Sequence, residues 1–157
     1  MKKSEFKDLN ITNKMEEFRM TQEEIMKMMQ NPEVREAVST FFMGNMQKQK
    51  FEKIKNYNLL NHDVKKGQIL FVGSSLMENF PINELQQTLV KPCIIYNRGV
   101  GGSVIAELLD SMEECIFELE PSKLFINIGT NDIASPDYKK EKLIVNYDNI
   151  LTQIRNC

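Results

Sequence analysis

Three short polar segments carry residues that could do chemistry together. Ser75 lies in "GSSL", Gly102 in "RGVGG" and Asn131 in "GTND". A serine hydroxyl can act as a nucleophile, a glycine lets backbone amides approach a substrate closely, and an asparagine amide donates a hydrogen bond without adding charge. A hydroxyl with neutral donors from separate loops is the equipment of acyl transfer, in which the donors form an oxyanion hole.

The same residues have plainer interpretations. Ser74 and Ser75 could be ordinary turn residues, and so could the glycines around Gly102. Asn131 and Asp132 could form an Asx turn and a helix cap. A phosphate-binding loop is a weaker competitor, because "GVGGS" lacks the lysine and the glycine spacing of a P-loop. The choice between a site and three unrelated turns depends on the fold that positions them.

Each polar segment follows a short apolar run, which is typical of a strand buried on both faces. The runs are "QILFV", "CIIYN" and "KLFINI", and helices are predicted over residues 76–89 (interrupted by Pro81), 103–119 and 137–155. This alternation predicts an α/β fold, in which a parallel sheet carries helices on both faces. Because the carboxyl ends of parallel strands meet at one edge, we expect Ser75, Gly102 and Asn131 to cluster there.

The N-terminal part of the chain has a different character. We interpret residues 1–62 as a helical arm and residues 63–157 as the α/β domain. Thr21 with Glu24 fits a capping box, and Asn31 before Pro32 fits the start of a longer helix. The apolar stripe of this arm is interpreted as packing surface, with a surface for a partner or a lipid as the alternative.

Composition excludes several classes of function. The net charge of −2 argues against a general nucleic-acid binder, and no segment approaches the roughly 18 apolar residues of a membrane span. The N-terminus has the charges of a signal peptide without its apolar core, which favours the cytoplasm. The cysteines at 93, 115 and 157 have neither zinc-site spacing nor an even count. We therefore expect a cytoplasmic protein with no metal site and no cofactor.

The segments "FVGSSLMENF", "NRGVGG" and "INIGTND" resemble the first three motif blocks of the SGNH, or GDSL-type, serine hydrolases, over about residues 66–156. The resemblance implies a flavodoxin-like three-layer sandwich and hydrolysis of a small ester, such as an acetyl group on a sugar or lipid. It implies that Ser75 is the nucleophile and that its backbone N–H helps to bind the oxyanion. Gly102 would supply a second backbone N–H, and Asn131 a side-chain amide.

Two features depart from the family pattern. Ser74 stands where the first block usually has aspartate, and the final Asp-x-x-His block does not occur before Cys157. The single histidine, His62, precedes the nucleophile strand and is interpreted as a solvated loop residue. The sequence therefore predicts the N-terminal part of an esterase that lacks its base and is inactive alone. A shortened pseudoenzyme, or a binding or scaffold protein that keeps the pocket, is the alternative; a helical interaction module working through residues 15–46 is a weaker one.

The family resemblance also has a consequence for association. In a flavodoxin-like order, the strand at 123–128 would be flanked by a fourth strand that this sequence lacks. An open strand edge with apolar faces invites pairing with another chain. Unless the arm or the last helix covers it, we expect self-association through this edge or through the arm.

Overall fold

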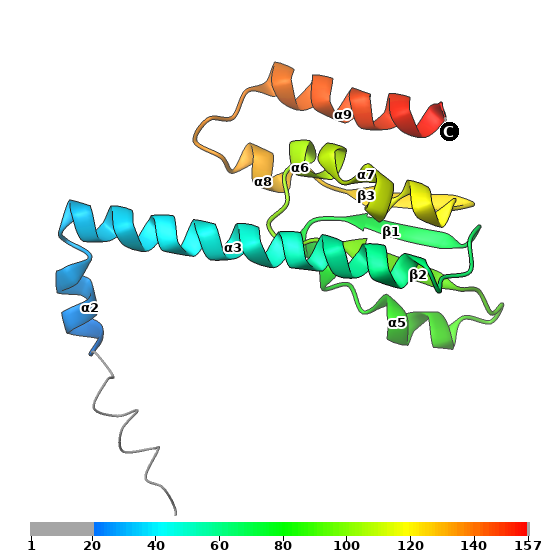
Figure 1. Cartoon of the computed structure of the whole chain (residues 1–157), viewed down its shortest axis with the longest axis horizontal. Helices are drawn as coiled ribbons and strands as arrows, with labels where there is room; N and C mark the ends of the chain where they lie inside the picture. The colour runs from blue at the N-terminus through cyan, green and yellow to red at the C-terminus, as the bar shows by residue number, and fades with distance from the viewer. Residues whose placement is uncertain (1–20, 157) are drawn as a thin grey trace, which may run out of the picture. The chain divides into compact units, whose positions relative to one another are not determined.

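The computed structural model describes residues 21–156 (Figure 1). Its contacts divide the chain into two compact units, Met1–Gly44 and Asn45–Cys157. The part of the predicted arm that falls in residues 1–20 lies outside the described residues, and the division at residue 62 stays a prediction. No helix within residues 21–156 is long and apolar enough to cross a membrane.

The first unit contains α2 (Gln22–Met28) and the beginning of α3 (Pro32–Asn61). The capping box is confirmed, because Glu24 N–H donates to Thr21 Oγ1 at 3.2 Å and Thr21 N–H donates to Glu24 at 2.8 Å. Glu33 N–H donates to the Asn31 side chain at 2.9 Å, which confirms the predicted start of the longer helix. The arm's stripe is exposed at Phe41 (65%) and Phe42 (63%), so these rings are not the packing surface that the sequence suggested.

The second unit is built on a parallel sheet of three strands in the order β2-β1-β3 (Figure 1). The strands are β1 (Ile69–Gly73), β2 (Ile95–Gly99) and β3 (Lys123–Asn127). The α/β class is thus as predicted, and β1 lies between the other two strands. The second strand begins two residues later than the apolar run at 93–97 indicated, because hydrophobicity marks burial and not the first paired residue.

The helices of the second unit are shorter than the sequence indicated. They are α4 (Ser75–Glu78), α5 (Ile82–Leu85), α6 (Ile105–Asp110), α7 (Met112–Cys115), α8 (Thr130–Ile133) and α9 (Lys140–Arg155). The predicted helix over 103–119 breaks at Ser111, whose hydroxyl donates to the Glu107 carbonyl oxygen at 2.8 Å. Such side-chain bonds to the preceding turn bend or interrupt helices.

Helices cover both faces of the sheet. On one face Leu70 and Val72 are fully buried in a core with Ile105 of α6 and Ile150 of α9, and Tyr57 of α3 belongs to the same cluster. On the other face α4 and α5 pack against β2. The result is a three-layer arrangement of the flavodoxin-like kind.

The side of the sheet that β3 forms is less covered than the rest. Within residues 21–156, β3 pairs only with β1, and α9 packs against α6. On the face that α4 and α5 share, the Phe125 ring is 49% exposed and lies 5.0 Å from the Phe71 ring. The outer edge of β3 is therefore open to further pairing.

Candidate active site

The turns that carry the candidate residues follow three strands that end at the same edge. Gly73 at the end of β1 is in register with Gly99 of β2 and with Asn127 of β3. Hydrogen bonds continue past the strands, from Ser74 N–H to the Asn127 oxygen at 3.1 Å and from Val100 N–H to the Gly73 oxygen at 2.8 Å. The structure thus brings the segments of Ser75, Gly102 and Asn131 to one edge of the sheet.

Ser75 is the first residue of α4 and is exposed, whereas the neighbouring Ser74 is buried. Because α4 spans only four residues, few peptide dipoles are aligned, and the helix dipole gives Ser75 little assistance. The Ser75 backbone N–H makes no hydrogen bond to any residue in the range 21–156. This leaves a hydroxyl and an N–H donor together at the start of the helix.

The position of α4 is fixed by close packing against β2. An alanine Cβ at Gly99 would lie 2.3 Å from the Glu78 backbone nitrogen, so only glycine allows the helix to approach this closely. Asn97, also on β2, donates from its side chain to the Met77 oxygen at 2.6 Å. The sequence suggested that Gly99 was a turn glycine, whereas its role in the structure is to seat the helix that begins at Ser75.

Gly102 occupies the loop between β2 and α6 with a φ of +71°, a conformation that side chains disfavour. Its N–H has no hydrogen-bond partner among the described residues, whereas the next N–H, of Ser103, donates to the Val100 oxygen at 3.2 Å. The neighbouring Gly101 has a different role from Gly102. A Cβ there would lie 2.2 Å from the Glu78 carboxylate, so this glycine makes room for Glu78 and not for a ligand.

Asn131 and Asp132 connect the turn after β3 to the loop after β2. Asn131 donates from Nδ2 to the Ser103 oxygen at 2.9 Å, and Asp132 accepts from the Ile105 N–H at 3.1 Å. The alternative of a helix cap is not what the structure shows, since the N-cap of α8 is Gly129 and makes no side-chain cap bond. A carboxamide nitrogen has two hydrogens, so Asn131 retains one donor for a ligand.

Within the range 21–156, no histidine lies at this edge of the sheet. His62 follows the end of α3 and precedes the amino end of β1, whereas Ser75 follows the carboxyl end of that strand. The length of β1, about 16 Å, therefore lies between them. The acidic groups near the turns already have partners, because Glu78 pairs with Lys53 and Asp132 with the Ile105 N–H. Among residues 21–156, this edge therefore provides a hydroxyl and N–H donors without a histidine to accept the hydroxyl proton.

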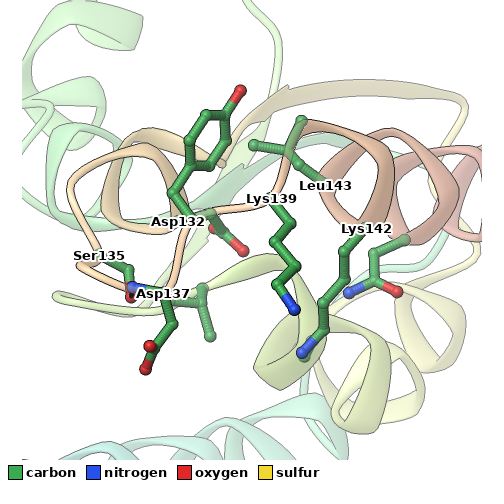
Figure 2. Close-up of a pocket in the computed structure, with 10 residues that line it drawn as sticks. Asp132, Ser135, Asp137, Lys139, Lys142 and Leu143 are labelled. Carbon is green, nitrogen blue, oxygen red and sulfur yellow. Dashed lines mark hydrogen bonds between the residues drawn. The ribbon is translucent and has the colours of Figure 1, made fainter.

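A separate pocket lies beside these loops (Figure 2). Its volume is about 270 Å³, and Asp132 and Val104 contribute to its lining, whereas Ser75, Gly102 and Asn131 do not. Figure 2 shows the side chains of Lys139 and Lys142 on one side of the pocket and those of Asp132 and Asp137 on the other. Charges of both signs line this hollow, and it is distinct from the edge where the candidate residues lie.

Comparison with known proteins finds likeness to solved structures. No protein-family profile matches the sequence, and no curated protein matches it. A solved structure provisionally named as a platelet activating factor, from Streptococcus pneumoniae, is 30% identical with a TM-score of 0.67, over 76% of this chain and 55% of that one. Another, provisionally named as an acylhydrolase, from Bacteroides fragilis NCTC 9343, is 22% identical with a TM-score of 0.54, over 65% of this chain and 51% of that one.

The two comparisons carry different weight. The second, at 22% identity, shows a shared fold alone. The first adds sequence likeness at 30% identity to the shared fold. The chain spans about half the length of each of these proteins, at 55% and 51%.

Proposed function

We propose that this chain carries the nucleophile and the oxyanion-binding donors of an SGNH-type serine ester hydrolase that acts on small acyl esters. The observation that supports it most is the placement, at one edge of the sheet, of three N–H donors that have no partner among residues 21–156. They are the Ser75 N–H, the Gly102 N–H and the second hydrogen of Asn131 Nδ2. The exposed Ser75 hydroxyl lies at the same edge. The name of one structural neighbour, an acylhydrolase, agrees with a hydrolase of this kind.

The proposed reaction has two displacement steps. Ser75 Oγ attacks the ester carbonyl carbon, its proton passes to a base, and the carbonyl oxygen gains negative charge as the bond to Oγ forms. The three N–H donors would stabilise that charge, which is greater in the transition state than in the bound ester. The C–O bond then breaks, the alcohol leaves with a proton, and water hydrolyses the acyl-serine to release the acid and restore Ser75.

The base is the component that this proposal must obtain elsewhere. A serine hydroxyl is almost wholly protonated at neutral pH, so without an acceptor only the catalysis due to binding and oxyanion stabilisation remains. We propose that polypeptide outside this chain supplies the base. The chain alone should then hydrolyse p-nitrophenyl acetate no faster than its Ser75→Ala variant does.

A non-catalytic binding protein is the second candidate. The observation in its favour is the same missing base, since the edge keeps its donors and its exposed hydroxyl without a proton acceptor in the range 21–156. The DNA downstream of codon 157 separates the two candidates. An in-frame Asp-x-x-His supports the hydrolase, and an immediate stop supports the binding protein.

The hydroxyl and its donors can be tested in this chain with a fluorophosphonate and added imidazole. In this reaction Ser75 Oγ forms a bond to phosphorus, the P–F bond breaks with loss of fluoride, and imidazole takes the hydroxyl proton. We expect phosphonylation at Ser75, detected by intact mass and peptide mapping, at a rate that rises with imidazole concentration. Equal labelling of the Ser75→Ala variant, or no labelling of the folded wild type, would contradict the proposal.

A further inference from the structure

The loop that carries Gly102 is held from the side of helix α3 by one partly buried cation, Lys50. Lys50 Nζ donates to the Gly102 carbonyl oxygen at 2.8 Å and to both carboxylate oxygens of Glu107 at 2.8 and 3.0 Å. An ammonium group has three hydrogens, so these acceptors use all of its donors. The Lys50 side chain is only 11% exposed. This lysine is therefore committed to the loop and is not a solvated surface charge.

Glu107 completes the connection between the lysine and the loop. Its carboxylate also accepts from Gln47 Nε2 at 2.9 Å and from the Val104 N–H at 3.0 Å. Burial alone would raise the pKa of Glu107, but the hydrogen bonds from Lys50, Gln47 and Val104 outweigh it, and the pKa lies below its ordinary value. Glu107 is thus held as the anion, and Lys50 is held between this anion and the Gly102 carbonyl.

The bond to Gly102 acts at the most adaptable point of the loop. Gly102 has a φ of +71° and no Cβ, so no side chain of its own restricts its backbone and thereby the direction of its N–H. The carbonyl that Lys50 binds belongs to the peptide that follows Gly102, and the N–H belongs to the peptide before it. When Lys50 fixes the peptide that follows Gly102, rotation about the Gly102 Cα is restricted. The directions available to the Gly102 N–H are therefore restricted as well.

The other side of the loop is held by different elements. Asn131 of α8 binds the Ser103 oxygen, and Asp132 binds the Ile105 N–H. On the α3 side, a Cβ at Gly102 would meet Met46 Cε at 3.1 Å and Lys50 Cε at 3.5 Å, so the helix packs directly on this residue. The backbone of residues 102–105 is therefore bound at every residue by a side chain from α3, α6 or α8.

We propose that Lys50 is a positioning residue for the oxyanion donor at Gly102. This inference rests on the proposed function, because it assigns the purpose of the contact to the direction of the Gly102 N–H. The alternative is a purely structural ion pair that ties α3 to α6 and has no effect on the N–H.

The effect on the reaction is measured by the rate of Ser75 phosphonylation in the full 157-residue chain. Losing one oxyanion donor outright typically costs about 10²–10³ in rate. Lys50→Met should cost about 10-fold, a smaller loss, because the Ser103 N–H still binds the Val100 oxygen on the same peptide. The control is Lys66→Met, which removes an exposed pair with Glu120 and should leave the rate unchanged.

Removing Lys50 alone leaves the Glu107 carboxylate without its cation, which destabilises a partly buried site. The double variant Lys50→Met/Glu107→Gln removes that charge, and its glutamine can still accept from the Val104 N–H. A positioning role predicts that the double variant recovers thermal stability but not the rate. If the rate returns together with the stability, the contact is purely structural and the inference is wrong.

A second measurement does not depend on the reaction. With ¹⁵N-glycine, the chain gives one amide signal for each of its 7 glycines. Lys50→Met should move the Gly102 signal, and Lys66→Met should not. If the folded wild type is not phosphonylated at Ser75, the proposed function is wrong and this role with it. If the wild type is phosphonylated, but Lys50→Met changes neither the phosphonylation rate nor the Gly102 amide signal, this role alone is wrong.

Discussion

Replacing Gly99 by alanine should displace the helix that begins at Ser75. The added Cβ would lie 2.3 Å from the Glu78 nitrogen, 2.7 Å from its Cα and 2.8 Å from the Met77 carbonyl carbon. All three are backbone atoms, so no side-chain rotation relieves the contact. Because ordinary contact begins at 3.4 Å, α4 must move away from β2 by about 1 Å.

A displacement of this size is large for a reacting group. A misplacement of about 1 Å can lower the rate of an enzymatic reaction by about 10²-fold. We therefore expect Gly99→Ala to phosphonylate at Ser75 about 10²-fold more slowly than the wild type. Overpacking should also lower the free energy of unfolding by about 1–3 kcal/mol, measured in urea.

The matched control is Gly44→Ala, the same chemical change within α3. A Cβ at Gly44 meets nothing within 4 Å, so the variant should keep the wild-type labelling rate. It should be about 0.5–1 kcal/mol more stable, because glycine is a poor helix former. A folded Gly99→Ala chain that labels as fast as the wild type would show that the seat of α4 on β2 does not position Ser75.

Four further perturbations test other parts of the molecule. Asn131→Ala should lower the phosphonylation rate about 10²–10³-fold. A near wild-type rate would show that Asn131 only holds the loop through its hydrogen bond to the Ser103 oxygen. Asn61→Ala should lower the free energy of unfolding by about 3 kcal/mol, because buried Arg98 loses bonds of 2.8 and 3.1 Å to the Asn61 oxygen; a loss below about 1 kcal/mol would contradict this. Light scattering should show that the wild type self-associates through the open edge of β3, and Phe125→Lys should reduce this association. A monomeric wild type would mean that the edge is protected. Because the pKa of Glu107 is lowered, its carboxylate stabilises the folded state above the ordinary pKa of 4.5, and this stabilisation is lost as the pH falls. The difference in melting temperature between the wild type and Glu107→Gln should therefore shrink in acid, and a difference independent of pH would contradict this.

The sequence predicts the sheet well because its signals are local. Each strand is a short apolar run that ends in glycine or asparagine, and a parallel sheet places all three ends at one edge whatever the details of packing. The common edge of Ser75, Gly102 and Asn131 therefore follows from strand order and direction alone. The capping box at Thr21 is equally local and is also correct.

Contacts between distant segments are what the sequence does not reveal. Lys50 lies in a helix of ordinary polar composition, and its bond to Gly102 spans 52 residues. Gly99 is indistinguishable from a turn glycine until α4 is seen against β2. Asn131 could equally cap its own helix, and only the fold shows that it binds the Ser103 oxygen instead.

The most direct test of the oxyanion site is a crystal structure of the chain phosphonylated at Ser75. In the adduct, one phosphonyl oxygen takes the place of the charged oxygen of the transition state. The proposed site predicts that this oxygen lies about 2.7–3.1 Å from the Ser75 nitrogen, the Gly102 nitrogen and Asn131 Nδ2. An adduct whose phosphonyl oxygens face solvent, away from these donors, would contradict it.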